Sequence, residues 1–401
     1  MSPLFGRRSA SPEDKFADEM VVLAKSLGGL NAERIDGFRL RLELPGGSTG
    51  IMNLGNIYRE AQQLTGEARA SRLRTAVLAM TPFVRPQTWD EAAPKLMPAV
   101  RSVSWLTTPP GPKPINKSFL PFLRLMCAID SEHALSYVTD DDLHKWGVSD
   151  DQAFETATQN LAARTFQVGR SGQIAIVMGP DGYTSSWLAA PSKLFRIASD
   201  VAPEVVAVAA ARDSLVLVDV ADVRATLKVL EEELTEYQKA PRQLSPVPYR
   251  VTATGVEVWE LPRSHPAWPQ VEKAQRFLAN VEYNQQGAVL DERLAKSGED
   301  VYVASYSLVG LPDGSVWSWA VWGKQVTNGL LPQVDVVVMG DNDHKDDRFG
   351  VSWADAIRLA ADWLVLEAEL DPPRWRYRGW PPAATLAALR SVAVPFPPTP
   401  Q

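Results

Sequence analysis

Proline is the residue that most limits what this chain can fold into, because 31 prolines are spread along its 401 residues. A proline removes a backbone donor, so it fits poorly inside long parallel strands that are buried on both faces. Turn signals instead separate short alternating segments, which predict hairpins at 38–54, 249–261 and 301–324. Helical patterns follow these strand pairs. The sequence therefore predicts an α+β fold with mostly antiparallel sheets packed with helices.

The length of the chain suggests two to three domains. We predict an N-terminal region of helix, hairpin and helix over residues 1–90, an α+β domain over 91–250, and a C-terminal α+β domain over 251–401. The clearest helix is expected at 222–239, where apolar residues recur in steps of three and four. A helix is also expected at 264–284, and a last long helix is expected to begin after Ser352. A shorter helix is expected to begin at Thr139, with Asp142 at the matching capping position and the acidic run 140–142 in its first turn. Two strands are expected on either side of Arg212.

Charge and cysteine content restrict the partners and the compartment. The net charge of -7 opposes a general attraction to nucleic acid or to anionic membranes. No uninterrupted apolar stretch long enough to span a bilayer occurs, and the N-terminus lacks the apolar core of a signal peptide. The single cysteine, Cys127, excludes an intramolecular disulfide, and its place on the apolar face of an expected strand predicts an inert role. We expect a soluble, cytoplasmic protein without a membrane or nucleic-acid partner, and its oligomeric state stays open.

The segment RWRYR at 374–378 tests the expectation about nucleic acid. Its alternation places the arginines on one face of an extended chain and the aromatic rings on the other. Single-stranded nucleic-acid grooves need rings and charges on the same accessible surface. We therefore predict an amphipathic edge strand, with Trp375 and Tyr377 packed inward and the guanidinium groups in water.

Catalytic and cofactor motifs are missing from the sequence. It has no phosphate-binding glycine loop, no dinucleotide fingerprint, no nucleophile elbow and no zinc-protease motif. The four histidines are far apart in sequence, and the acidic loop at 340–350 lacks the closing glutamate of a calcium loop. We predict no catalytic residues, no cofactor and no metal site.

One polar cluster is a candidate binding site, made of Arg101, Asp181, Tyr183 and Ser185. The turn at Asp181 leads into a helix whose first residues offer hydroxyl groups and free backbone N–H groups, which suits an anion. The alternative is structural: Asp181 caps the helix, and Arg101 pairs with a carboxylate such as Asp219. Both interpretations stay open on the sequence.

A second candidate is the aromatic group Trp317, Trp319 and Trp322 in the hairpin at 301–324. Trp317 and Trp319 share a strand face, so packing in the core is the default interpretation. An exposed face would instead mark a contact with another protein.

Four segments, in order, carry a resemblance to a known family: PAVRSVSW, YVTDDDLHKWGVSDDQAFETATQNLAAR, GPDGYTSSWLAAPSKL and ARDSLVLVD. Together they resemble the YtpQ-like bacterial proteins, a family of unknown function, over roughly residues 90–250. The resemblance implies a small cytoplasmic α+β domain and brings no established activity, cofactor or catalytic residue. Residues 251–401 look like an extension of that domain.

The sequence thus favours a non-catalytic cytoplasmic protein, a scaffold or adaptor whose partner is another protein. The alternative is a cryptic hydrolase-type enzyme, or a binder of small anions, that uses Asp and Arg side chains of the middle domain.

Overall fold

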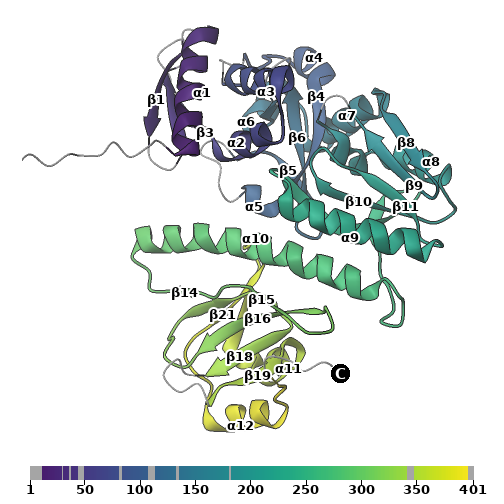
Figure 1. Cartoon of the computed structure of the whole chain (residues 1–401). Coiled ribbons are helices and arrows are strands. Elements are labelled where there is room, and N and C mark those ends of the chain that lie inside the picture. The colour runs from purple at the N-terminus through teal and green to yellow at the C-terminus, as the bar shows by residue number, and fades with distance from the viewer. Residues whose placement is uncertain are drawn as a thin grey trace, which may run out of the picture. The chain divides into compact units, whose positions relative to one another are not determined.

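The computed structural model describes residues 11–28, 30–35, 38–43, 49–80, 84–106, 113–131, 135–179, 182–340 and 347–395. It confirms the predicted α+β class, with helices packed on several mostly antiparallel sheets (Figure 1). Two compact units can be distinguished: Met1–Pro98 with Met126–Ala163 and Ala240–Arg242, and Ala99–Leu125 with Arg164–Lys239 and Gln243–Gln401. This division does not test the three predicted domains, which stay a prediction.

The first unit contains α1 (Pro12–Gly28), β1 (Asn31–Ile35), β2 (Arg39–Glu43), β3 (Thr49–Asn53), α2 (Gly55–Gln62), α3 (Gly66–Leu78), α4 (Trp89–Ala92), the 3-10 helix η1 (Ala93–Lys95), β7 (Leu135–Tyr137), α6 (Asp140–Trp146) and α7 (Asp150–Ala163). Strands β1, β2 and β3 form an antiparallel sheet. Leu40 and Leu42 of β2 are fully buried, whereas Arg41 between them is exposed. The period-two alternation thus gives the predicted half-buried strand.

Helix α6 begins at the predicted capping site. The hydroxyl of Thr139 accepts a bond from the Asp142 amide, and the Asp142 carboxylate accepts the Thr139 amide at 2.9 Å. Gly147 ends the helix with φ of 69°. The acidic run 140–142 lies in the first turn of this helix and therefore has the structural role that was predicted.

Strand β4 (Leu96–Ser102) and strand β6 (Leu123–Asp130) contribute residues to both units. β6 lies between β4 and β5 (Asn116–Leu120), and β7 also pairs with β6. Cys127 lies on β6 with no exposed surface, and burial raises the pKa of its thiol to about 12. A thiol with so high a pKa forms little thiolate, which agrees with the predicted inert role.

The second unit contains α5 (Val103–Leu106), β5 (Asn116–Leu120), β8 (Gln167–Ser171), β9 (Ile174–Met178), the 3-10 helix η2 (Thr184–Ala189), α8 (Pro191–Ser199), β10 (Val205–Ala211), β11 (Val216–Asp219), α9 (Val223–Lys239), β12 (Gln243–Val251), β13 (Val256–Val258), α10 (Trp268–Ser297), β14 (Tyr302–Val303), β15 (Ser307–Gly310), β16 (Val316–Gly323), β17 (Gly329–Leu331), β18 (Val336–Gly340), β19 (Phe349–Ser352), α11 (Trp353–Leu359), the 3-10 helix η4 (Ala361–Trp363), β20 (Leu364–Glu367), β21 (Arg374–Tyr377) and α12 (Ala383–Ser391).

A six-stranded sheet in the order β13-β12-β10-β11-β9-β8 forms the first half of this unit. The predicted strand pair on either side of Arg212 is present as β10 and β11, and the predicted hairpin at 249–261 as β12 and β13. Helix α9 packs on β10 and β11, with Val229 and Leu230 in the same apolar cluster as Val206 and Val208. The helix predicted at 222–239 is thus confirmed.

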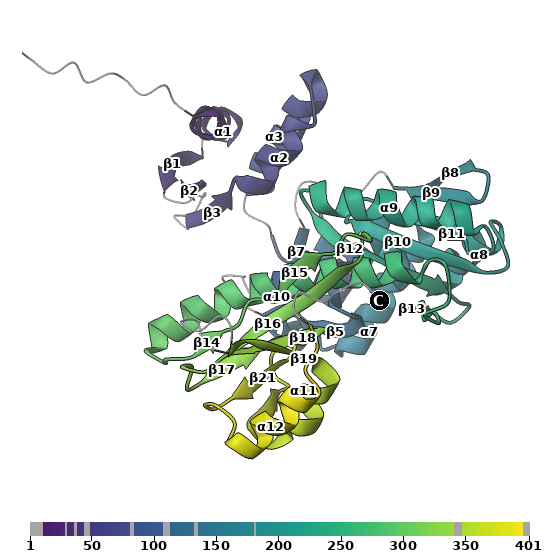
Figure 2. The same ribbon diagram turned by 60° about the horizontal axis from the view of Figure 1, so that its bottom comes forward.

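Helix α10 is 30 residues long and extends past the predicted end at Asn284 to Ser297. It contacts α9 and β12 on one side and the strands β14, β15 and β16 on another, and Figures 1 and 2 both show it beside β14 and β15. Because several of its faces are buried, it carries no single apolar stripe. Its buried side chains include the polar residues Arg276, Glu282 and Gln286.

Two four-stranded sheets complete the unit, in the orders β15-β16-β18-β19 and β14-β17-β21-β20. Most neighbours in them are antiparallel, but β16 pairs with β18 and β14 with β17 in parallel. Trp322 and Tyr377 lie in the apolar cluster of these sheets, with ring centroids 5.0 Å apart.

The prediction of an edge strand at RWRYR was wrong. Strand β21 lies between β17 and β20, and Arg374 is completely buried. Its guanidinium donates to Gln286 Oε1 at 2.7 Å, to the carbonyl of Ala304 at 2.8 Å and to the carbonyl of Tyr283 at 2.7 Å. Tyr377 packs inward as predicted. The error is that α10 covers the face on which Arg374 lies, so this guanidinium is not in water.

The long helix predicted after Ser352 was also wrong in its length. Ser352 caps α11 as expected, since its hydroxyl accepts the Asp355 amide at 3.1 Å, but the helix ends at Leu359. The chain then forms β20, in which Leu364 pairs with Tyr377 of β21. Pairing with β21 overrides the local helical pattern that continued to Leu364.

None of the helices in the described part of the chain combines the length and the apolar character that crossing a bilayer requires.

We expect Arg374→Met to lower the free energy of unfolding by about 3 kcal/mol, because it leaves buried carbonyl groups and Gln286 without their donor. The matched control is Arg376→Met in the same strand, whose half-buried guanidinium pairs with Glu367. That change should cost about 1 kcal/mol or less. Urea unfolding followed by tryptophan fluorescence measures both, and equal shifts of the midpoint would contradict the structural role of Arg374.

Candidate functional site

A cavity of about 350 Å³ in the second unit is the strongest candidate for a binding site. Its polar and aromatic lining comes from four parts of the unit: the turn between β5 and β6, helix α10, the strands β15 and β16 with their flanking residues, and the segment before β18. The residues that line it are Pro121, Phe122, Val247, Val258, Glu272, Gln275, Arg276, Leu278, Ala279, Tyr283, Tyr306, Ser318, Gln333, Val334 and Asp335. The cavity is thus mainly apolar, with a small group of charged and polar side chains.

Three charged side chains form a network in this cavity. Arg276 binds Asp335 through two bonds, Nε to Oδ2 at 2.7 Å and Nη2 to Oδ1 at 3.0 Å. The third guanidinium nitrogen, Nη1, lies 2.8 Å from Oε2 of Glu272, one helical turn earlier in α10. Each nitrogen of the guanidinium therefore has a carboxylate partner.

Ser318 on β16 holds Asp335 from the other side. Its backbone amide and its hydroxyl both donate to Oδ2 of Asp335, at 2.7 and 2.6 Å. The hydroxyl in turn accepts the backbone amide of Asp335 at 2.8 Å. The position of Asp335 is thus fixed by α10 on one side and by β16 on the other.

Aromatic rings make up another wall of the cavity. Tyr283 and Tyr306 stack with ring centroids 5.5 Å apart and an interplanar angle of 9°, and Phe122 meets Tyr283 edge-on at 5.9 Å. The backbone of Tyr306 is held by α10, because Asn284 accepts its amide at 3.0 Å and Asn280 donates to its carbonyl at 2.7 Å. The stack is therefore built on the same helix as the charged network.

Burial changes the ionisation of these groups. Burial raises the pKa of the Glu272 carboxyl and outweighs the lowering effect of Arg276. Burial alone would lower the pKa of Arg276, but its bonds and charge interactions with Asp335 and Glu272 raise that pKa. Burial also raises the pKa of Tyr283, to about 12, and that of Tyr306. Both tyrosines are therefore neutral at neutral pH.

A second cavity of about 290 Å³ shares Pro121, Phe122, Tyr283 and Gln333 with the first. Its lining also includes Arg124, whose Nε donates to Asp371 at 2.6 Å. A third cavity, of about 420 Å³, lies at β20 and β21 and is lined by Asp362, Trp363, Val365, Glu367, Arg376 and Arg378.

Three of the four residues of the predicted anion site lie within the described part of the chain. Arg101, Tyr183 and Ser185 are all buried, and Asp181 lies outside the described residues. An amide-to-hydroxyl bond from Val100 to Ser186, at 3.3 Å, brings β4 next to η2. Arg101 donates to the carbonyl of Val100 at 2.7 Å. None of the three cavities described above includes these residues, and an anion site there stays a prediction.

The predicted tryptophan group is divided between two faces of β16. Trp322 has no exposed surface and donates its indole N–H to the carbonyl of Gly379 at 3.2 Å. Trp317 and Trp319 point to the other face and are half-buried. The Arg276 guanidinium lies 5.6 Å from the Trp317 ring centroid.

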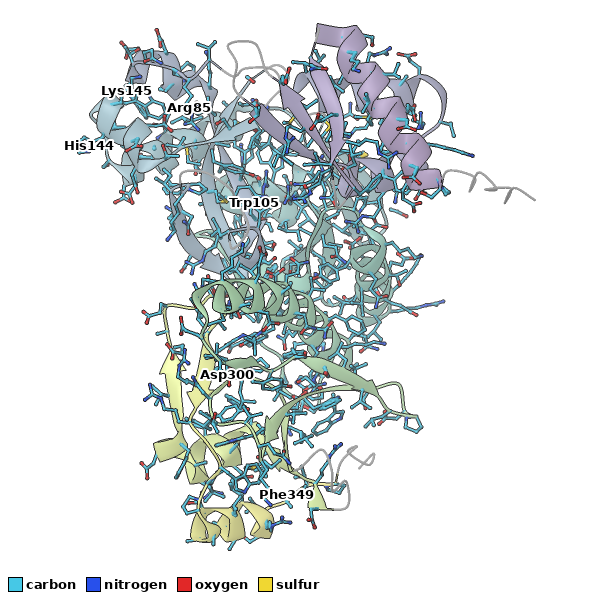
Figure 3. All side chains as sticks on the ribbon, turned by 90° about the vertical axis from the view of Figure 1, so that its left-hand side faces the viewer. Arg85, Trp105, His144, Lys145, Asp300 and Phe349 are labelled. Atoms are coloured by element: carbon cyan, nitrogen blue, oxygen red, sulfur yellow. The ribbon has the colours of Figure 1, made fainter. Side chains whose placement is uncertain are left out.

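Two of the four histidines lie within the described residues, one in each unit. His144 is exposed on α6 (Figure 3), and His265 accepts the amide of Ala267 and packs edge-on against Trp259. His133 and His344 lie outside the described residues, as does most of the acidic loop at 340–350. Within the described ranges, no three His, Cys, Asp or Glu side chains are arranged to hold a metal ion.

The sequence did not single out Glu272, Arg276 or Asp335. Asp335 is 59 residues from Arg276, so only the tertiary fold brings them together. The one available signal was the spacing of Glu272 and Arg276 on the predicted helix, which fits an i,i+4 ion pair but is common on solvated helices.

The buried carboxyl of Glu282, also on α10, is not part of the lining of this cavity. Glu282 is almost fully buried and accepts the backbone amide of Ser104 of α5 at 2.8 Å. Burial raises its pKa to about 7, although the bonds from Ser104 and Ser102 act in the opposite direction. The Tyr237 hydroxyl of α9 is also buried, and within the described residues it has no hydrogen-bond partner.

No family model, curated protein or solved structure matches this chain. The resemblance to the YtpQ-like family therefore stays a prediction, and function has to be inferred from the site itself.

We expect Glu282 to make stability depend on pH. Its folded pKa of about 7 lies above the ordinary value of 4.5, so its contribution is fully present below about pH 4.5 and is lost as pH rises through 7. Glu282→Gln should therefore gain up to about 3 kcal/mol over the natural chain between pH 5 and 8. Thermal unfolding across this range measures the gain. The control Glu292→Gln, at an exposed position of the same helix, should leave the pH profile unchanged, and an unchanged profile for both variants would refute the assignment.

Proposed function

We propose that this protein is non-catalytic and works by binding, with the 350 Å³ cavity as its ligand site. The observation that carries the proposal is the convergence of Glu272, Arg276 and Asp335 with stacked tyrosines in one mainly apolar cavity. Its volume lies at the lower end of the range of small-molecule sites. Polar groups in such a site fix the orientation of a ligand, and apolar walls provide most of the affinity.

The hydrogen bonding of Ser318 supports binding rather than catalysis. A serine nucleophile needs an adjacent base that takes its proton. The carboxylate next to Ser318 belongs to Asp335, which is already bonded to Arg276 and to the Ser318 amide. That carboxylate is held as an ion-pair partner. The hydrolase alternative in the middle domain has less support, because Arg101, Tyr183 and Ser185 are buried.

We place the protein in the cytoplasm. This part of the proposal is supported by the single cysteine, which is buried and fits a reducing compartment.

Filling the cavity should abolish binding of small probes. The probes are benzyl alcohol, benzoate and benzylammonium, and the one that binds the natural chain best is used to test the variants. Because Ala279 lines the cavity, we expect Ala279→Phe to weaken binding of that probe by about tenfold or more. Ligand-observed NMR titration measures the affinities. The matched control, Ala295→Phe, changes an exposed alanine of the same helix and should leave them unchanged. Binding that survives Ala279→Phe in a folded variant, or no saturable binding of any probe, would rule out the cavity as a ligand site.

A protein partner is the second candidate, favoured by the half-exposed tryptophans. Trp317 and Trp319 lie on β16, whose neighbour β15 is the terminal strand of its sheet. A terminal strand offers backbone donors and acceptors to an added strand, and neighbouring aromatic side chains provide affinity and specificity. We propose an extended segment of another protein as the occupant.

Replacing both tryptophans by serine should remove a stoichiometric partner that the natural chain retains from native lysate. The control is Val365→Ser with Leu366→Ser, which changes exposed apolar residues on β20 in the other sheet. Quantitative affinity capture with mass spectrometry compares the three proteins. Loss of the same partner with both double variants, or with neither, would argue against this surface.

A further inference from the structure

The cavity carries more negative than positive charge in its lining. Its charged side chains are two carboxylates, Glu272 and Asp335, and one guanidinium, Arg276. All three nitrogens of that guanidinium are bonded to these carboxylates. An anionic ligand would therefore meet an arginine that is already occupied, together with two groups of its own charge. A cationic ligand would balance the charge of the lining.

Glu272 is the group with capacity for a further positive charge. Asp335 accepts bonds from Arg276 and twice from Ser318, whereas within the described residues the recorded partner of Glu272 is Arg276. The charged groups that act on Glu272 are Arg276 of the same helix, Asp335 before β18 and Arg263 before α10. Burial outweighs the favourable effect of the two arginines, so the carboxylate is incompletely compensated.

The aromatic wall is the second feature that suits a cation. A cation near a tyrosine or phenylalanine ring is attracted by the negative face of the ring, and the attraction grows when water is excluded. Tyr283 already has Tyr306 stacked on it and the Arg374 guanidinium at 5.3 Å from its ring centroid. We therefore assign ligand contact to Tyr306 and Phe122, which line the same cavity.

We propose that the cavity binds a small organic cation, with its ammonium nitrogen at Glu272 and the alkyl groups on that nitrogen against the rings of Phe122 and Tyr306. This inference rests on the proposed ligand-binding function of the cavity. It names the class of ligand: an alkylammonium compound small enough for a cavity of about 350 Å³. A neutral molecule of the same shape lacks the attraction to Glu272 and should bind less tightly.

Choline and its neutral analogue, the alcohol in which carbon replaces the choline nitrogen, test the proposal by isothermal titration calorimetry. We expect choline to bind the natural chain about tenfold more tightly than the analogue. Glu272→Gln should remove this difference. Glu292→Gln should keep it, because Glu292 is an exposed glutamate that also has an i,i+4 partner on α10, Lys296.

A pH titration gives an independent readout that does not need a variant. Choline affinity should rise as pH increases through the raised pKa of Glu272, whereas affinity for the neutral analogue should stay flat. Equal affinities for the two compounds, or a choline preference that survives Glu272→Gln, would overturn the cation assignment. If only neutral or anionic benzyl probes bind, and Ala279→Phe blocks their binding, the cavity is a ligand site but its ligand is not a cation. If neither choline nor any benzyl probe binds, the proposed ligand site and the proposed cation class are both wrong.

Discussion

The buried guanidinium of Arg374 is the interaction on which the second unit depends. It has no exposed surface, and its recorded partners are carbonyl groups of Tyr283, Ala304 and Leu330 together with Oε1 of Gln286. Burial lowers its pKa to about 10, so it stays protonated at neutral pH. A buried cation bonded to neutral acceptors is stable only when these acceptors are held in place. Arg374 therefore fixes α10 against β14, β17 and β21.

The same contact sets the geometry of the cavity. Glu272, Arg276, Ala279 and Tyr283 follow one another along α10 in steps of three and four, so they share one face of the helix. Gln286 lies one turn beyond Tyr283, and both of these residues bind Arg374. A displacement of α10 at Arg374 would move Arg276 away from Asp335, because the helix is a rigid rod. The cavity is thus organised by a contact at its far end.

Local signals predicted much of the fold, and the predictions failed where contacts between distant segments override the local pattern. Thr139 with Asp142, and the stripe on α9, are short-range features that read correctly from the sequence. Helix α10 was predicted too short, because its second half carries polar residues such as Gln286 on a buried face. Arg374 was placed in water for the same reason. The cavity escaped prediction because Asp335 meets Arg276 only in the tertiary structure.

Contacts within the folded chain explain the charges of Arg276 and Asp335 more fully than they explain the charge of Glu272. A bidentate bond to Asp335 already neutralises Arg276, and Ser318 donates two further bonds to Oδ2 of Asp335. Glu272 adds a second carboxylate that burial makes costly to ionise, and an uncharged residue would avoid that cost. The ion pair with Arg276 offsets only part of that cost. A ligand that carries a positive charge would repay the cost on binding, which is the physical reason for assigning Glu272 to recognition rather than to structure.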